Sequence, residues 1–387
     1  MKAIMAGGGT GGHLFPAMAL AEELKSRLPD LSLLFVGAKG GIEATLLAKS
    51  GWRFEGIRAS GLQAKRLPQR LRGLALIPLG VIRSRAILRQ FSPDVVVGLG
   101  GYASAAMVLA AVLSRVPTVI HEQNVFAGLT NRWLGRVVDH VAVAFEPTST
   151  FFPEGKVRVT GNPVRAELFG LNRTDALARF DLDPNRLTLL IFGGSQGAHR
   201  LNRAVLEALP LLESERGRIQ FLHATGPRDH DVVRQGYIAG GHRAIVEPFF
   251  GEMAVAYAAA DLCLCRAGAG TVAELCALGK PSILVPFPFA ADDHQRWNAE
   301  SLVACGAARM ILDRDLSGAT VVEIVKSLLR DRSGLQTMGQ KARALAKPDA
   351  SARLADLVIE TVHRRQFTVN SSPSTVNRQQ FTVNRQP

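Results

Sequence analysis

Short apolar runs alternate with helical stretches along most of this chain. Several of the runs are continuous stretches of β-branched or aliphatic residues, which is the pattern of strands buried on both faces of a parallel sheet. In the first half, the expected strands are residues 2–6, 33–37, 95–98, 118–121, 141–145 and 157–160. Helical spacing follows the first strand over Ala17 to Leu28. The first half therefore predicts a parallel α/β domain.

The same pattern begins again in the second half. An apolar strand over Thr188 to Phe192 precedes the glycine turn 193–197. Further strands are expected at residues 219–223, 244–247, 261–265 and 282–285. Because each half opens with a strand and a glycine turn, the sequence predicts an α/β protein of two Rossmann-like, doubly wound domains. The turn-forming pair Asn162-Pro163 places these domains at 1–163 and 164–346.

The end of the chain differs from the rest. Thr-Val-Asn recurs at 368–370, 375–377 and 382–384, with a strict seven-residue period. The repeat lacks the apolar positions of a coiled coil, and the residues around it are mostly Ser, Gln, Arg and Pro. We therefore predict a disordered tail over 366–387.

The chain lacks the features of a membrane-spanning or exported protein. It contains no run of about 18 or more apolar residues, so no transmembrane helix is expected. The first strand begins almost at once, so no signal peptide is expected. The four cysteines lack the spacing of a metal site, which favours buried free thiols in a reducing compartment and no bound metal.

The positive charge is concentrated in two segments. The net charge is +13; Gly56 to Pro93 contains eight basic residues and no acid, and the residues from Arg364 onward contain four arginines and no acid. Within the first segment, the apolar helical run Leu74 to Ile87 is flanked by arginines. Such a helix suits an anionic membrane surface, although a helix with a merely solvated basic face has the same pattern. Nucleic acid is not expected, because no aromatic residues interleave with the charges.

Residues 7–16, Gly-Gly-Gly-Thr-Gly-Gly-His-Leu-Phe-Pro, carry the strongest local signal. They connect the first strand to the first helix, where unpaired backbone N–H groups and the helix dipole favour an anion or a sugar. His13 adds an imidazole to this corner; a tight turn with a surface histidine is the alternative interpretation. The lysine of an ATP-binding P-loop and the acid of a dinucleotide site are both missing. The first domain contains no Asp-X-Asp pair next to the end of a strand, so metal-dependent binding of a sugar nucleotide is not indicated.

Seven motifs occur in a fixed order along the chain. They are Gly8-Gly9-Thr10-Gly11-Gly12-His13, Gly100-Gly101-Tyr102, His121-Glu122-Gln123-Asn124, Gly161-Asn162-Pro163-Val164-Arg165, Gly193-Gly194-Ser195-Gln196-Gly197, Arg266 to Glu274, and His294 to Asn298. In this order and spacing they closely resemble the MurG family of bacterial glycosyltransferases, over about residues 1–364.

The resemblance implies the GT-B fold, in which two Rossmann-like domains face each other across a cleft. A C-terminal helix, at about 347–364 here, packs back on the first domain in that family. The implied reaction is inverting transfer of N-acetylglucosamine (GlcNAc) from UDP-GlcNAc to the 4-hydroxyl of the N-acetylmuramyl (MurNAc) pentapeptide of undecaprenyl-pyrophosphoryl lipid I. The product, lipid II, serves peptidoglycan synthesis.

The resemblance also implies where such an enzyme works and what it binds. It implies a peripheral enzyme at the cytoplasmic face of the bacterial inner membrane, with an anionic membrane surface as a partner. The cell-wall and division machinery is a further expected partner. No cofactor and no metal is expected, because arginine and loop amides would carry the charge of the leaving group.

The same resemblance assigns site residues. His13 is the leading candidate for the catalytic base, and Glu122 is the second, acting directly or by orienting a histidine. Arg165 would neutralise the departing pyrophosphate, and Glu274 would accept the ribose hydroxyls. The residues expected at the donor are Thr10, Gly11, Gly12, Asn124, Arg165, Ser195, Phe250, Ala269, Gly270, Thr271, Val272, Ala273, Glu274 and Gln295. Those expected at the acceptor are Gly100, Gly101 and Tyr102.

Two other kinds of function fit parts of the sequence. Another GT-B enzyme acting on a UDP-sugar, such as a UDP-GlcNAc 2-epimerase or a different glycosyltransferase, would keep the second domain but lose the glycine loops of the first. A non-catalytic protein that binds a nucleotide sugar or a lipid would keep a binding site without turnover. The intact loops of the first domain favour the transferase.

Overall fold

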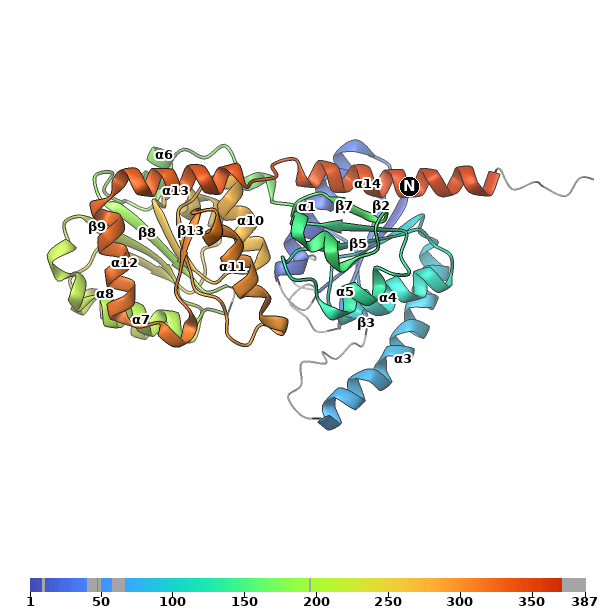
Figure 1. The fold of residues 1–387 in the computed structure, drawn as a ribbon, viewed down its shortest axis with the longest axis horizontal. Helices are drawn as coiled ribbons and strands as arrows, with labels where there is room; N and C mark the ends of the chain where they lie inside the picture. The colour runs from blue at the N-terminus through green and yellow to red at the C-terminus, as the bar shows by residue number, and fades with distance from the viewer. Residues whose placement is uncertain (9–10, 40–46, 48–49, 58–66, 195, 371–387) are drawn as a thin grey trace, which may run out of the picture.

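The computed structural model describes residues 1–8, 11–39, 47, 50–57, 67–194 and 196–370, without the side chains of residues 11, 67–77, 102 and 365–370. It contains two parallel α/β units that lie side by side along the long axis of the molecule (Figure 1). Each unit buries apolar residues on both faces of its own sheet. This architecture confirms the α/β class and the two doubly wound domains that the sequence predicts.

The first unit has a seven-stranded sheet in the order β3-β2-β1-β4-β5-β6-β7. Its strands are β1 (Lys2–Ala6), β2 (Ser32–Ala38), β3 (Phe54–Ile57), β4 (Val95–Gly98), β5 (Thr118–Glu122), β6 (His140–Val143) and β7 (Val157–Val159). Its helices include α1 (Gly11–Arg27), α3 (Leu67–Phe91), α4 (Tyr102–Leu113) and α5 (Leu129–Leu134). The six expected strands are present within two residues, whereas the edge strand β3, Phe-Glu-Gly-Ile, is not predicted because it lacks an apolar run.

The second unit has a six-stranded parallel sheet in the order β10-β9-β8-β11-β12-β13. Its strands are β8 (Leu187–Phe192), β9 (Ile219–Ala224), β10 (Ala244–Glu247), β11 (Leu262–Cys265), β12 (Ser282–Leu284) and β13 (Ala308–Met310). Its helices are α6 (Arg173–Arg179), α7 (His199–Ala208), α8 (His230–Ala239), α9 (Met253–Ala259), α10 (Ala269–Leu278), α11 (His294–Ala304), α12 (Gly318–Arg330) and α13 (Arg332–Ala344). Only the short edge strand β13, which contains Arg309, departs from the expected set.

The last helix, α14 (Ala350–Asn370), packs back on the first unit (Figure 1). Its residues Leu354, Leu357 and Val358 are buried in one cluster with side chains of β1 and α1. The first sheet ends at β7 and the second begins at β8, so the expected domain boundary at residue 163 falls in the connection between them.

Three expectations need correction. Helix α1 begins at Gly11 rather than Ala17, so Pro16 lies inside the helix and the end of the glycine cluster forms its first turn. Helix α14 continues to Asn370, so residues 366–370 are helical rather than part of a disordered tail; no Gly or Pro interrupts the chain before Pro373. Residues 371–387 lie outside the described part. Cys305 is exposed at the end of α11, whereas the other three cysteines are buried.

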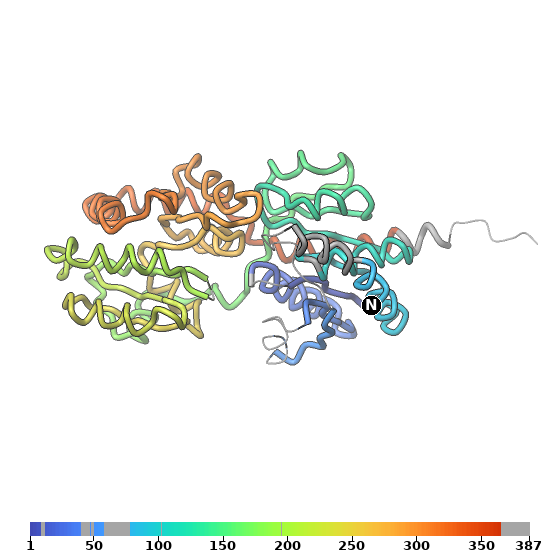
Figure 2. Tube along the Cα trace, turned by 90° about the horizontal axis from the view of Figure 1, so that it is seen from below, coloured from blue at the N-terminus to red at the C-terminus, as the bar shows by residue number. Residues whose placement is uncertain are grey.

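The register of the first sheet brings two glycine loops together. Ala6 at the end of β1 pairs with Gly98 at the end of β4, and the two strands are parallel. The loops that follow them therefore leave the same edge of the sheet side by side. Figure 2 shows the two units from below, with the connection between them at their junction.

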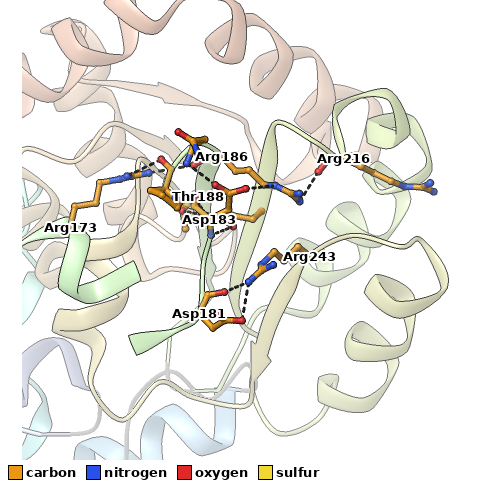
Figure 3. Close-up of polar contacts among 10 residues, drawn as sticks. Arg173, Asp181, Asp183, Arg186, Thr188, Arg216 and Arg243 are labelled. Atoms are coloured by element: carbon orange, nitrogen blue, oxygen red, sulfur yellow. Dashed lines mark hydrogen bonds and ion pairs between the residues drawn. The ribbon is translucent and has the colours of Figure 1, made fainter. Parts of the chain in front are cut away.

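In the second unit, a polar cluster lies at the amino ends of the strands, opposite the glycine turn that follows β8 (Figure 3). Arg173 makes a two-pronged ion pair with Asp261, with both N···O distances at 2.9 Å, and the Thr188 amide donates to Asp261 at 2.8 Å. Nearby, Arg186 pairs with Asp183, and Arg243 bonds to Asp181. The cluster ties the amino ends of β8 and β11 to α6 and lies away from the glycine turn 193–197, so its role is structural.

Candidate active site

The glycine loops of the first unit meet at the carboxyl ends of β1 and β4. A Cβ added to Gly101 would lie 2.5 Å from the Gly8 carbonyl oxygen, and one added to Gly100 would lie 2.6 Å from His13 Nδ1. Both Gly100 and Gly101 also have positive φ, at 107° and 84°. Side chains at either position would be strained and would displace the opposite loop. The loop expected at the acceptor is thus in contact with the predicted base.

His13 lies in the first turns of α1 and is half-buried. Its Nδ1 atom is buried and makes no hydrogen bond within the described residues. Burial lowers the pKa of His13 below its usual value, whereas the negative charge of Glu122 acts in the opposite direction. His294 of the second unit is close enough to lower this pKa further. At neutral pH the imidazole is therefore uncharged, which is the state that a general base requires.

Glu122 ends β5 and has only 2% of its surface exposed. Its Oε1 accepts hydrogen bonds from the backbone N and from Nδ2 of Asn124, at 3.0 and 3.1 Å. Its Oε2 accepts from the Gly128 amide at 3.1 Å and from Asn131 Nδ2 at 2.8 Å. These four donors use the lone pairs of the carboxylate, so the geometry suits a residue that shapes the loop and places negative charge near His13.

Arg165 joins the two units. Its guanidinium carbon lies 4.5 Å from the centre of the Phe15 ring of α1, and its Nη2 lies 3.5 Å from Glu274 Oε1 in α10. Nη1 forms a 2.7 Å ion pair with Glu167. The other oxygen of Glu274 accepts a 2.9 Å hydrogen bond from Tyr257. Burial raises the pKa of Glu274, and the charge of Arg165 opposes that effect.

The N-terminus of α10 contains the predicted donor loop. Gly268 is extended, with φ −64° and ψ 148°, and the helix begins at Ala269. Ala269 and Val272 are buried, whereas Gly270, Thr271 and Ala273 are partly exposed. The first amides of a helix have no partner within it, so this end can receive a phosphate oxygen.

The glycine turn after β8 is held closely against the turn after β9. A Cβ added to Gly197 would lie 2.0 Å from the Thr225 carbonyl oxygen, and one added to Gly226 would lie 2.5 Å from the Gln196 carbonyl oxygen. Both glycines have positive φ. This packing fixes the backbone of the turn just before α7. Ser195, the residue expected to hold the pyrophosphate there, lies outside the described residues.

Gln295 and Phe250 supply different kinds of contact. Gln295 Oε1 accepts a 3.0 Å hydrogen bond from the Phe287 amide, which ties α11 to the loop before it. In that loop Asp292 and Asp293 have φ of 51° and 52°, an uncommon conformation for residues other than glycine. Phe250 is 4% exposed and packs on Phe180 with ring centres 5.6 Å apart. The side chain of Phe250 therefore belongs to the core of the second unit.

The predicted site residues come from both units and from the connection between them. The first unit contributes His13, Glu122 and Asn124, and the second contributes Glu274 and Gln295. Thr10 lies outside the described residues, and Gly11 and Tyr102 are described only by their backbone. Gly12 is exposed at the start of α1.

Sequence reasoning missed three residues at this place. Phe15 lies under Arg165, and Asn131 donates to Glu122, but neither has a sequence signal beyond its position near a motif. Asn298 closes the last of the seven motifs without a role of its own, although it contacts Asn124 of the first unit. No group of three or more His, Cys, Asp or Glu side chains in the described part of the chain is arranged to hold a metal ion.

An apolar and basic surface lies on α3. Leu79 and Ile82 are 60% and 65% exposed, and Arg85 and Arg89 beside them are exposed. Arg83, on the same helix, is also exposed and forms a 3.3 Å ion pair with Glu55. Residues 58–66 and the side chains of 67–77, which include the basic positions before Arg83, are outside the description. None of the helices in the described ranges is long and apolar enough to cross a membrane.

Comparison with known proteins places this chain among glycosyltransferases. Residues 3–143 match the model of the glycosyltransferase family 28 N-terminal domain, and residues 188–354 match that of the family 28 C-terminal domain. The chain is 43% identical over 366 residues to a UDP-N-acetylglucosamine–N-acetylmuramyl-(pentapeptide) pyrophosphoryl-undecaprenol N-acetylglucosamine transferase of Geobacter sulfurreducens. That match covers 95% of this chain and 100% of the relative.

The chain is also similar to solved structures over most of its length. The crystal structure of Acinetobacter baumannii MurG is 30% identical, with a TM-score of 0.72, over 93% of this chain and 99% of that one. A UDP-GlcNAc 2-epimerase from Neisseria meningitidis, solved with UDP-GlcNAc bound, has a TM-score of 0.66 at 14% identity, over 93% of this chain and 100% of that one. The second likeness shows a shared fold.

Proposed function

Because this chain belongs to the MurG family of glycosyltransferases, we propose that it transfers GlcNAc from UDP-GlcNAc to an undecaprenyl-pyrophosphoryl MurNAc-pentapeptide. The observation that carries the proposal is the 43% identity to a transferase of that name over the whole length of the relative. The contact of His13 with the Gly100 loop supports it, because this contact gives the first unit a base beside the loop expected at the acceptor.

The reaction proposed is a single displacement with inversion at the anomeric carbon. The 4-hydroxyl of the MurNAc sugar attacks this carbon, the new C–O bond forms, and the bond to the UDP oxygen breaks. Neutral His13 takes the hydroxyl proton, and UDP leaves with the bonding electron pair. Glu122, held by four donors, keeps a negative charge near His13 and stabilises the imidazolium that forms.

Arg165 and the amide groups of α10 are proposed to take the charge of the departing UDP. Arg165 now pairs with Glu274, which we propose as the acceptor for the ribose hydroxyls. A bound donor would place its pyrophosphate near the guanidinium and its ribose near the carboxylate, so both members of this ion pair gain new partners. The stacking on Phe15 would hold the guanidinium in place during this exchange.

The remaining donor contacts are proposed from their position. Gln295 and Asn124 would bind the sugar from opposite units, and the segment Ala269 to Ala273 would bind phosphate through its amides. Thr10, Gly11, Gly12 and Ser195 would complete this donor site, with the base read by the backbone of Phe250. The acceptor would enter along Gly100, Gly101 and Tyr102, next to His13.

We also propose that the α3 surface binds the cytoplasmic face of the inner membrane. Exposed Leu79 and Ile82 can enter the interface, and Arg85 and Arg89 can bind anionic headgroups. Further exposed apolar residues, Leu129 and Trp133, lie on α5 of the same unit. A surface of this kind would keep the enzyme where its lipid acceptor is.

A direct assay tests the proposal. The purified chain is incubated with labelled UDP-GlcNAc, with and without a lipid-linked muramyl-pentapeptide, and both UDP release and labelled lipid are measured. We expect release that depends on the acceptor and label that appears in the lipid. Release equal to the acceptor-free background would contradict the transferase, and acceptor-independent conversion to the 2-epimer of the donor would favour an epimerase.

A further inference from the structure

Asn298 connects the two units through a fully buried side chain. It lies in α11 of the second unit, and none of its surface is exposed. Its Nδ2 donates to Asn124 Oδ1 at 3.1 Å and to the Ala267 carbonyl oxygen at 3.2 Å. Its Oδ1 accepts from the Val125 amide at 3.0 Å. One amide group therefore bonds to the loop after β5 and to the loop that leads into α10.

The orientation of this amide is fixed by its backbone partners. The Val125 N–H can only donate and the Ala267 carbonyl can only accept, so Oδ1 must face Val125 and Nδ2 must face Ala267. Nδ2 then also faces Asn124, which must offer its own oxygen. The NH₂ group of Asn124 is left for Glu122, as observed at 3.1 Å. The hydrogen bonds that link Ala267, Asn298, Asn124 and Glu122 therefore allow only one orientation of each asparagine amide.

The loop that Asn298 holds is already firm on its other side. Thr148, also fully buried, donates from its hydroxyl to the carbonyl oxygens of Asn124 and Val125, at 3.1 and 2.9 Å. Thr148 thus holds this loop within the first unit, but it does not determine the position of the loop relative to the second unit. Asn298 sets that position, because its bonds reach both sides of the junction.

Two neighbours on α11 support this position. Trp297 stacks on Phe126 of the first unit, with ring centres 6.0 Å apart and planes 17° apart. Gln295, the residue expected at the donor sugar, precedes Asn298 by about one turn of the same helix. Figure 1 shows α10 and α11 on the side of the second unit that faces the first.

We infer that Asn298 is a positioning residue that sets the orientation of Asn124 and the spacing of the two units around the donor sugar. The inference rests on the proposed function, since it concerns the same site. The donor's UDP portion is expected to bind the second unit alone, so Asn298 should affect transfer far more than UDP binding. In Asn298→Asp, a carboxylate oxygen would face two acceptors, Asn124 Oδ1 and the Ala267 carbonyl.

The experiment compares N298A and N298D with R296A, which alters the same helix on its exposed face, where Arg296 pairs with Asp293 and Glu300. We expect kcat to fall by about tenfold or more in both Asn298 variants, because buried groups that bond to the Asn298 amide would lose their hydrogen bonds. UDP affinity should stay within about twofold of wild type. R296A should match the wild type. In an N124A background, N298A should add little further loss, because the two residues act as one unit.

A second measurement does not depend on activity. Spin labels on the exposed native Cys305 and on an introduced E154C report the distance between the units. We expect a narrow distribution in the wild type and R296A, and a broad one in both Asn298 variants. Full activity with a narrow distribution in N298A, or UDP affinity falling in step with kcat, would overturn the inference. A wild type inactive with the acceptor would instead count against the proposed function, while the distances would still test Asn298.

Discussion

Gly100 lies so close to His13 that a Cβ on Gly100 would be 2.6 Å from both Nδ1 and Cε1 of the imidazole. The glycine follows β4 and the histidine lies in α1, yet the backbone of the first leaves room for the ring of the second. The positive φ of Gly100, 107°, strengthens the requirement for glycine. The place of the proposed base therefore depends on a residue that has no functional group of its own.

The variant G100A should separate catalysis from donor binding. An added methyl group would push the imidazole aside, and a misplacement of about 1 Å can lower kcat by about 100-fold. UDP affinity should change little, because the donor's UDP portion is expected to bind the second unit. The matched control is G155A, where φ is also positive, at 85°, but no atom lies within 4 Å of the added Cβ. Full turnover in G100A would show that His13 is not the base.

The pH dependence of kcat should show the lowered pKa of His13. Burial stabilises the neutral imidazole, so the proton is bound only at a pH below the usual value of about 6.5. The neutral form is the base, so kcat should stay high as the pH falls through 6.5 and decline only below it. A pH–rate profile between pH 4.5 and 8, with H13N as the comparison, checks this. An acid limb centred at or above 6.5, or one that persists in H13N, would contradict the assignment.

Buried histidines should also make the stability of the second unit depend on pH. His223 bonds to Asn202 and Tyr237, and burial lowers its pKa to about 3. Its folded pKa lies below the unfolded value of about 6.5, so the unfolded chain binds the extra proton and stability is lost as the pH falls from 6.5. Between pH 7 and pH 5 the loss should be about 2 kcal/mol for this group. Denaturant unfolding of wild type and H223Q measures it; equal pH slopes would contradict the expectation.

The sequence predicts the fold of this protein better than its junction. Buried strands such as β1 and β8 are continuous apolar runs, and the pattern alone locates them. The apolar pattern does not predict the edge strands β3 and β13, because both are short and contain polar or glycine residues. The start of α1 escapes it because Gly11 and Gly12 suggest a turn, whereas the chain already enters its helix there.

The site divides in the same way. The ordered motifs name the candidate residues of each loop, such as Gly101, because a motif is a local pattern of the chain. The contacts between the two units, in contrast, are not predicted from the sequence. Asn124 and Asn298 are 174 positions apart, and Phe15 of α1 contacts Arg165 of the connection after β7. Spacing along the chain carries no information about such pairs, because they depend on how the two folded units come together.

The cluster of Figure 3 should support stability and leave the chemistry unaffected. Arg173 meets Asp261 with two 2.9 Å bonds while both are partly buried, so R173A should lower the free energy of unfolding by about 1–2 kcal/mol. The exposed pair Arg179–Glu252 is the control, and R179A should cost no more than about 0.5 kcal/mol. Denaturant unfolding and the transferase assay together check the result. A loss of kcat in R173A at a temperature where it is fully folded would place this edge in the functional site.

Membrane binding should depend on the apolar residues of α3 and on anionic lipid. The double variant L79E/I82E places charge where two aliphatic side chains are 60% and 65% exposed, so its partition into vesicles of phosphatidylglycerol and phosphatidylcholine should fall by about tenfold or more. The control is V232E/I238E, which alters residues equally exposed on α8 of the other unit, at 66% and 61%. Co-sedimentation measures both, and added salt should weaken wild-type binding because headgroup attraction is screened. Equal binding by the two double variants would exclude α3 as the membrane surface.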